Sequence, residues 1–199
     1  MMVAELGTMS MRLVLGMILG IVLATLVGCD GTPDGGKDSG LGSDAGPITL
    51  SVGVGTVDFE ALPDSGVVEV VKGPQGGIHL IINARAVEMD QPGNPDDPGD
   101  VSNPITRFEA FSSTGAPMHW VDQLGAPLPP YHLGWFPGRD GGLEIGGHIL
   151  RLHVPETSAS IDAYLDMIDG KPMRIRVTVE QVNGRTGVGE AEVITRKMQ

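Results

Sequence analysis

The sequence predicts an all-β domain, an antiparallel β-sandwich, preceded by a signal helix and a disordered linker. Three observations lead to this prediction. Apolar and polar side chains alternate along much of residues 48–199, which is the pattern of half-buried strands. The 199 residues include 30 glycines and 15 prolines, which supply many turns. Only residues 158–169 show the apolar spacing of a helix.

The predicted elements follow one another in a simple order. Roughly eight to ten short strands are expected from the spacing of the turns. Asn183 and Gly184 form the strongest short hairpin signal, between the last two strands, and Gly170 ends the predicted helix. The segments with the clearest strand pattern are 48–54, 67–71, 78–86, 148–154, 173–179 and 187–195.

The closing part of the chain suggests a more specific arrangement. Residues 169–194, DGKPMRIRVTVEQVNGRTGVGEAEVI, resemble the final hairpin of an immunoglobulin-like or fibronectin-like domain. That resemblance implies an immunoglobulin-like order of strands in the predicted sandwich. The chain has a single cysteine, so it has no pair for the core disulfide of an antibody domain, and a true antibody-type domain is excluded.

The strongest functional signal lies in the first thirty residues. The apolar run from Leu13 to Val27 follows Arg12 and would rise about 22 Å as a helix, which is short for a bilayer core of about 30 Å. Such a run is typical of a secretory signal. Cys29 follows it, and the stretch Leu-Val-Gly-Cys at 26–29 resembles the bacterial lipobox. That resemblance implies cleavage before Cys29 and its acylation; the alternative is an ordinary signal peptide or short membrane helix with a cysteine there by chance.

The chain is therefore predicted to have three parts. These are a lipoprotein signal peptide at 1–28, a lipid anchor with a flexible Asp/Gly linker at 29–47, and the β-sandwich domain at 48–199. Residues 30–47 contain six glycines and four aspartates and cannot form a core. A calcium-binding loop is the alternative for this stretch, although its acidic spacing fits no EF-hand. We expect a membrane-anchored lipoprotein in the cell envelope, on the periplasmic side of either membrane or at the cell surface.

The charge of the chain excludes one class of partner. Lys and Arg number 13 against 25 Asp and Glu, which gives a formal net charge of −12. No basic stripe is present to neutralise phosphates, so nucleic acid is not an expected partner. The expected partners are the lipid bilayer, through acylated Cys29, and an envelope protein or glycan.

The stretch Gly-Pro-Gln-Gly-Gly-Ile-His at 73–79 is the most distinctive motif inside the domain. It is similar to a Gly-x-Gln-Gly-Gly-x-His stretch in a group of Gram-negative lipoproteins, a resemblance that implies no particular activity. The functional interpretation is a binding edge that uses Gln75, His79 and Arg85. The alternative is a hairpin turn that enters a strand whose polar face meets water.

Aromatic residues gather in one short region. Trp120, Tyr131, Trp135 and Phe136 lie within seventeen residues that also contain several prolines. Exposed aromatic rings on rigid loops could stack on sugar rings, which makes Trp120, Tyr131 and Trp135 candidate ligand-binding residues. The alternative is that one tryptophan fills the core and the other rings cover it.

Metal ligands and enzyme motifs are weak or absent in the sequence. The five histidines include Met118-His119, a candidate copper pair, and His148 and His153, which do not share one strand face. Residues 89–103 form a long acidic loop, interpreted as an unstructured insertion with calcium binding as the alternative. No nucleophile elbow, P-loop or dinucleotide fingerprint is present.

These observations together predict a non-catalytic binding or scaffolding lipoprotein with no metal and no cofactor. A module that binds divalent calcium or copper is the first alternative. A small glycan-acting enzyme is the second, because paired carboxylates are recognised by their distance in space and not by their spacing in sequence.

Overall fold

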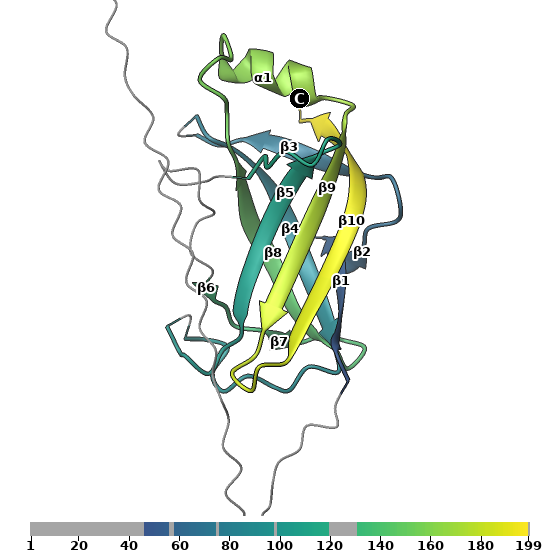
Figure 1. Ribbon diagram of the computed structural model, residues 1–199, viewed down its shortest axis with the longest axis vertical. Coiled ribbons are helices and arrows are strands. Elements are labelled where there is room, and N and C mark those ends of the chain that lie inside the picture. Colours follow the sequence, from purple (N-terminus) through teal and green to yellow (C-terminus); the bar gives the residue numbers. More distant parts are fainter. Residues whose placement is uncertain (1–45, 56–57, 75, 98, 120–130, 199) are drawn as a thin grey trace, which may run out of the picture. The chain divides into compact units, whose positions relative to one another are not determined.

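The domain is built almost entirely of β-strands, as the sequence predicts (Figure 1). A computed structural model describes residues 46–55, 58–74, 76–97, 99–119 and 131–198. Within these residues ten strands join one hydrogen-bonded sheet, and one short helix accompanies it. The elements are β1 (Ile48–Val54), β2 (Glu60–Ala61), β3 (Gly66–Lys72), β4 (Ile78–Val87), β5 (Ile105–Ser112), β6 (Tyr131–His132), β7 (Phe136–Pro137), β8 (Leu143–Leu152), α1 (Ile161–Ile168), β9 (Pro172–Glu180) and β10 (Thr186–Lys197).

The strand order differs from the predicted sandwich of two antiparallel sheets. Strand β4 pairs with β8 on one side, and on the other side with β3 at one end and β1 at the other. Strands β1 and β3 also pair with β10, both in parallel, and β10 continues through β9 to β5. Because all described strands belong to one mixed sheet, the immunoglobulin-like sandwich is not confirmed.

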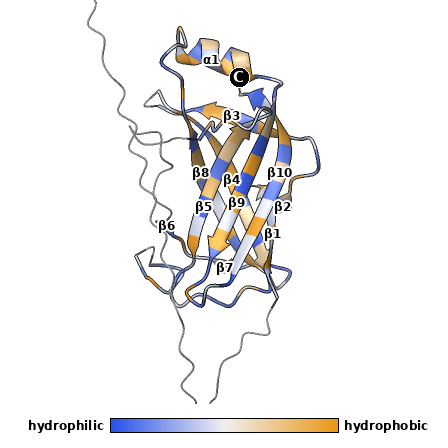
Figure 2. Cartoon of the chain, in the orientation of Figure 1, coloured by the Kyte–Doolittle hydropathy of each residue, from blue (hydrophilic) through white to orange (hydrophobic). Residues whose placement is uncertain are grey.

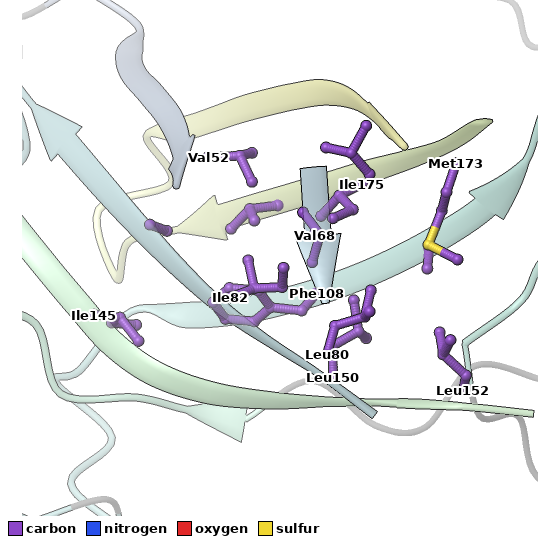
Figure 3. Close-up of a cluster of buried hydrophobic side chains, with 14 of the residues drawn as sticks. Val52, Val68, Leu80, Ile82, Phe108, Ile145, Leu150, Leu152, Met173 and Ile175 are labelled. Carbon is purple, nitrogen blue, oxygen red and sulfur yellow. The ribbon is translucent and has the colours of Figure 1, made fainter. Parts of the chain in front are cut away.

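The sheet curves so that its two halves enclose the core. In Figure 3 the labelled side chains point toward one another between the strands, with Ile82 and Leu80 from β4, Ile145 and Leu150 from β8, and Ile175 from β9. All five are buried. The core is therefore shared between the β4–β8 pair and the β5–β9–β10 strands, and its burial is the main favourable term in the stability of the fold.

Alternation of side chains places one face of each strand in this core. Along β9 the side chains of Met173, Ile175, Val177 and Val179 are buried, and the arginines between them are not. Figure 2 shows the same alternation of hydrophobic and hydrophilic residues on β9 and β10. The period of two in the sequence thus predicted these strands correctly.

The predicted turns and helix are confirmed. Gly184 takes a φ of 81° in the turn that joins β9 to β10, a left-handed conformation that favours glycine. The helix α1 begins after Ser160, whose hydroxyl accepts a hydrogen bond from the Ala163 N–H at 3.0 Å. Thr195 of β10 donates its hydroxyl to the carbonyl groups of Ile168 and Lys171, which fastens the end of the helix to the sheet.

A buried arginine fastens the first described residues to the rest of the domain. The Arg185 side chain is 7% exposed. Its guanidinium donates to the carbonyl oxygens of Gly46, at 2.9 Å, and of Glu88, and it pairs with the Asp90 carboxylate at 3.1 Å. Three separate segments meet at this one side chain, so its removal would loosen them together.

The acidic loop 89–103 is ordered in its described residues, and the prediction of an unstructured insertion is wrong for them. The fully buried Asn103 donates through Nδ2 to the carbonyl oxygens of Asn94 and Asp97, at 2.9 and 2.8 Å. Ser102 donates both its N–H and its hydroxyl to Asp100, which lowers the pKa of that carboxyl. Side chains that hydrogen-bond to nearby backbone give such a loop a fixed shape without a core of its own.

Candidate functional site

A cleft opens where the two ends of the curved sheet approach each other. Strand β5 forms one wall and β8 the other, and the cavity between them has a volume of about 640 Å³. This volume lies in the ordinary range for small-ligand pockets. We call this cavity the β5–β8 cleft; its walls are residues 106–109 and 145–151, with His119, Tyr131, Leu133, Gly134 and Phe136 around them.

Chain segments that pair with both strands close the two ends of the cleft. At one end Met118 lies between the walls, since its N–H donates to the Ala110 carbonyl and its own carbonyl accepts from the His153 N–H, both at 2.8 Å. At the other end β6 pairs with β5, and β7 pairs with β8. The walls between these ends have no strand partner on the cleft side among the described residues.

The floor of the cleft is an aromatic stack. The rings of Phe108 and His148 lie parallel across the gap, with centroids 3.9 Å apart and an interplanar angle of 14°. Burial lowers the pKa of His148 from 6.5 to about 4. The floor is therefore uncharged at neutral pH.

A bulge in β8 turns His148 toward this floor. The register of β4 with β8 shifts between Ile82 and Ala84, so β8 carries one extra residue there. Gly147 sits in the bulge with a φ of 66°, and its N–H donates to the Asn83 side-chain oxygen at 2.7 Å. A glycine at this position permits the left-handed backbone that restores the inward orientation of the following histidine.

The rim of the cleft combines cations with exposed apolar and aromatic side chains. Arg107 and Arg151 stand on opposite walls, and neither has an ion pair among the described residues. Tyr131, Phe136 and Ile149 lie beside them with 54%, 46% and 55% of their surfaces exposed. Exposed rings next to unpaired cations are unusual for a surface that serves only to cover a core.

His119 contributes a buried polar atom that lacks a partner. Its side chain is 5% exposed, and its Nδ1 lies 3.0 Å from the Ala110 carbonyl oxygen. Its Nε2 is buried without a hydrogen bond to any described residue. Because buried polar groups are nearly always paired, this atom at the edge of the cleft is a candidate contact for a bound group.

The structure separates the aromatic residues that the sequence analysis grouped. Tyr131 lies at the cleft and is half exposed, as a ligand-binding role requires. Trp135 is fully buried and donates from Nε1 to the Thr106 hydroxyl at 3.1 Å. Trp135 therefore fills the core, which is the alternative that the sequence left open for one tryptophan, and its ring is not exposed for contact with a ligand. Trp120 lies outside the described residues.

The structure does not place His79 and Arg85, two residues of the predicted binding edge with Gln75, at an edge of the sheet. Strand β4, which carries His79 and Arg85, has strand partners on both sides and is no edge. The two residues are six positions apart, roughly 20 Å along a strand. Arg85 pairs with Asp140 at 3.0 Å and with Glu144 at 3.4 Å, so its charge is already compensated. Gln75 and Cys29 lie outside the described residues.

Sequence reasoning missed the arginines and Phe108, and it considered His119 and His148 only as metal ligands. Among the residues that the structure describes, no three His, Cys, Asp or Glu side chains come close enough to hold a metal ion. The local signal at His148 was the preceding Gly146-Gly147 pair, which is typical of a bulge. No local signal could have shown that β5 and β8 face each other.

Comparisons with known proteins found no relative from which a function could be inferred. No protein-family model, no curated protein and no solved structure matches the chain. The helix in the described part of the chain is too short and too polar to cross a membrane. The function proposed below therefore rests on the residues of the cleft and on the signals in the sequence.

Proposed function

We propose that the chain is a membrane-anchored lipoprotein of the bacterial envelope whose β-domain binds an envelope protein or glycan in the β5–β8 cleft. The lipobox-like stretch that ends in Cys29 and the Asp/Gly linker at 30–47 support the anchor. Acyl chains on one cysteine would hold the chain at the bilayer, and the linker would let the domain search around that point. The immunoglobulin-like arrangement stays a prediction and is not needed for this proposal.

The rim of the cleft is the observation that carries the binding role. Arg107 and Arg151 have no ion pair among the described residues, and they stand over an uncharged floor beside the exposed Tyr131 ring, in a chain whose net charge is −12. Two uncompensated cations on an acidic protein favour a ligand that brings negative or strongly polar groups. Among the described residues that line the cleft, Glu109 is the only carboxylate, whereas glycoside hydrolysis ordinarily uses a pair. These features support binding without catalysis.

Site-specific photocrosslinking of the full chain in cells tests this role. A benzophenone amino acid replaces Tyr131 at the cleft, and in a matched control it replaces Met167, which is 56% exposed on α1. We expect a discrete crosslinked product from position 131 only, and we expect Arg107→Glu with Arg151→Glu to remove it. Equal labelling from both positions, or labelling at 131 that survives the double charge reversal, would refute binding at the cleft.

A further inference from the structure

The two walls of the cleft present backbone groups that no described strand uses. In an antiparallel pair alternate residues turn their N–H and C=O toward the partner, and the residues between them turn these groups away. Ala110 bonds to Met118 on the cleft side, so Phe108, two residues away on β5, also turns its backbone toward the cleft. On the other wall the His153 N–H donates to Met118, so it points into the cleft. Arg151 and Ile149 lie two and four residues before it, so their backbone groups also face the cleft.

Met118 shows that the distance between the walls suits one strand. It bonds at the same time to Ala110 of β5 and to His153, the residue directly after β8, with two hydrogen bonds of 2.8 Å. Short antiparallel bridges join Pro117 to Phe111 and His119 to Leu152. The cleft continues from this point between the same two strands, and its cavity of about 640 Å³ is the space that further residues of such a strand would occupy.

We propose that the β5–β8 cleft binds a short extended peptide as an added strand that hydrogen-bonds to both walls. This inference rests on the proposed binding function and specifies its ligand as a peptide segment of an envelope protein with alternating apolar and acidic side chains. Strand addition to an exposed sheet edge is a general mode of peptide recognition, in which backbone bonds give affinity and alternate side chains give specificity. A cleft with an edge on each side offers such a peptide two sets of backbone partners.

The side chains around the cleft determine which peptide fits. Successive residues of a strand point to opposite faces, so alternate side chains would face the floor and the rim. The floor is the Phe108–His148 stack, uncharged at neutral pH, and it favours apolar side chains. The rim carries Arg107 and Arg151, which form no ion pair within the described part of the chain and favour carboxylates. Glu109 on the same rim disfavours a run of consecutive acidic residues.

The free length of the walls limits the peptide segment to about four or five residues. Two residues of β5 already have partners on the cleft side: Thr106 pairs with Tyr131, and Ala110 hydrogen-bonds to Met118. Four residue steps separate these positions, roughly 14 Å along a strand. His119 stands at the Met118 end of this length, so a backbone group of the bound peptide is the natural partner for its unsatisfied Nε2.

Titration of the full chain with the blocked peptide acetyl-Val-Glu-Val-Glu-Val-amide tests the proposal. Isothermal calorimetry measures the affinity, and amide hydrogen exchange measures protection at Phe108, Ile149 and Arg151. We expect binding that protects all three amides. Methylation of alternate peptide nitrogens removes two backbone bonds, each worth about 1 kcal/mol, and should weaken binding at least 10-fold. The Val-Lys-Val-Lys-Val analogue should bind at least 10-fold more weakly, because its lysines carry the same positive charge as the rim arginines and are repelled by them.

Protein variants provide an independent check. Ile149→Pro removes one N–H that faces the cleft, and Ile149→Thr is the matched control that keeps it. We expect the proline variant, and not the threonine variant, to lose at least 5-fold in affinity. Should the proline variant not fold, the methylated peptide still decides the question, because it leaves the protein unchanged.

Three results would overturn the proposal. One is binding of the peptide without protection of the three amides. Another is binding of chitotetraose at the cleft in place of the peptide, which would make the ligand a glycan and leave the proposed function intact. The third is peptide binding only after residues 120–130 are replaced by a Gly-Ser linker of equal length. That result would mean that residues 120–130 of this chain, and not a partner, occupy the cleft. If position 131 gave no crosslink in a chain that keeps Arg107 and Arg151, in contrast, the proposed function itself would be refuted.

Discussion

The pH dependence of stability should be governed in part by His148, because this residue is partly buried and no charged group offsets the cost of its desolvation. Its pKa falls to about 4 through burial alone. In the unfolded chain a histidine has a pKa near 6.5. Between these values the unfolded state binds more protons than the folded state, so the free energy of unfolding decreases as the pH falls from 6.5 toward 4.

The size of the effect follows from the two pKa values. A pKa difference of one unit corresponds to about 1.4 kcal/mol, so the full loss is at most about 3 kcal/mol. Most of this loss is reached by pH 4.5, which gives roughly 2 kcal/mol between pH 7 and pH 4.5. Other groups titrate over the same range, so the contribution of His148 must be isolated by a variant that cannot titrate.

His148→Phe is that variant, because a phenyl ring can keep the stack on Phe108. Urea unfolding of the original chain and of His148→Phe at pH 7 and pH 4.5 gives four free energies. We expect the original chain to lose about 2 kcal/mol more than the variant between the two pH values. A proton NMR titration of the His148 ring should also give a pKa well below 6. Equal pH dependence of the two chains, or a ring pKa near 6.5, would refute the claim that the floor is buried and uncharged.

Three further substitutions test the structural framework of the cleft. Arg185→Met removes the guanidinium that joins Gly46, Glu88 and Asp90, and urea unfolding should show a loss of about 2 to 4 kcal/mol. Asn103→Ala leaves two carbonyls of the acidic loop without their donor. We expect the free energy of unfolding to fall by about 1 to 3 kcal/mol and proteolysis within residues 91–100 to become faster. An unchanged cleavage rate would contradict the described loop. Gly134→Ala places a methyl group against the Pro95 carbonyl, so it should lower the melting temperature and change the NMR shifts of the cleft residues, whereas neutral behaviour would mean that the loop does not pack there.

Elements in which apolar and polar side chains alternate clearly could be predicted from the sequence. Alternation of isoleucine and valine with arginine and threonine predicted β9, and Asn183-Gly184 predicted the turn after it. Spacing of apolar residues predicted a helix within 158–169, and α1 (Ile161–Ile168) lies inside that range. In each case the deciding interactions lie within a few residues of one another, so the sequence pattern contains them.

The cleft could not be predicted, because its walls meet only through long-range pairing. The inward residues of β5 include Thr106 and Ala110, whose low hydrophobic contrast hides the period of two, and the sequence analysis did not single out this strand. Parallel pairing of β10 with β1 and β3 bends the sheet until β5 approaches β8, and no pattern within one segment records such pairing. The exposed aromatic residue Tyr131 was identified, but the cations that accompany it were not.

Mass spectrometry of the intact chain tests the central claim most directly, namely that this is a lipid-anchored binding protein of the envelope. The full-length chain would be expressed in a Gram-negative bacterium and extracted from the membrane fraction with detergent. We expect a mature chain that begins at Cys29 and carries the added mass of its acyl chains, and we expect Cys29→Ala to abolish both the added mass and the membrane association. A chain that keeps its first 28 residues, or one that stays in the membrane without acylation, would contradict the proposed anchor.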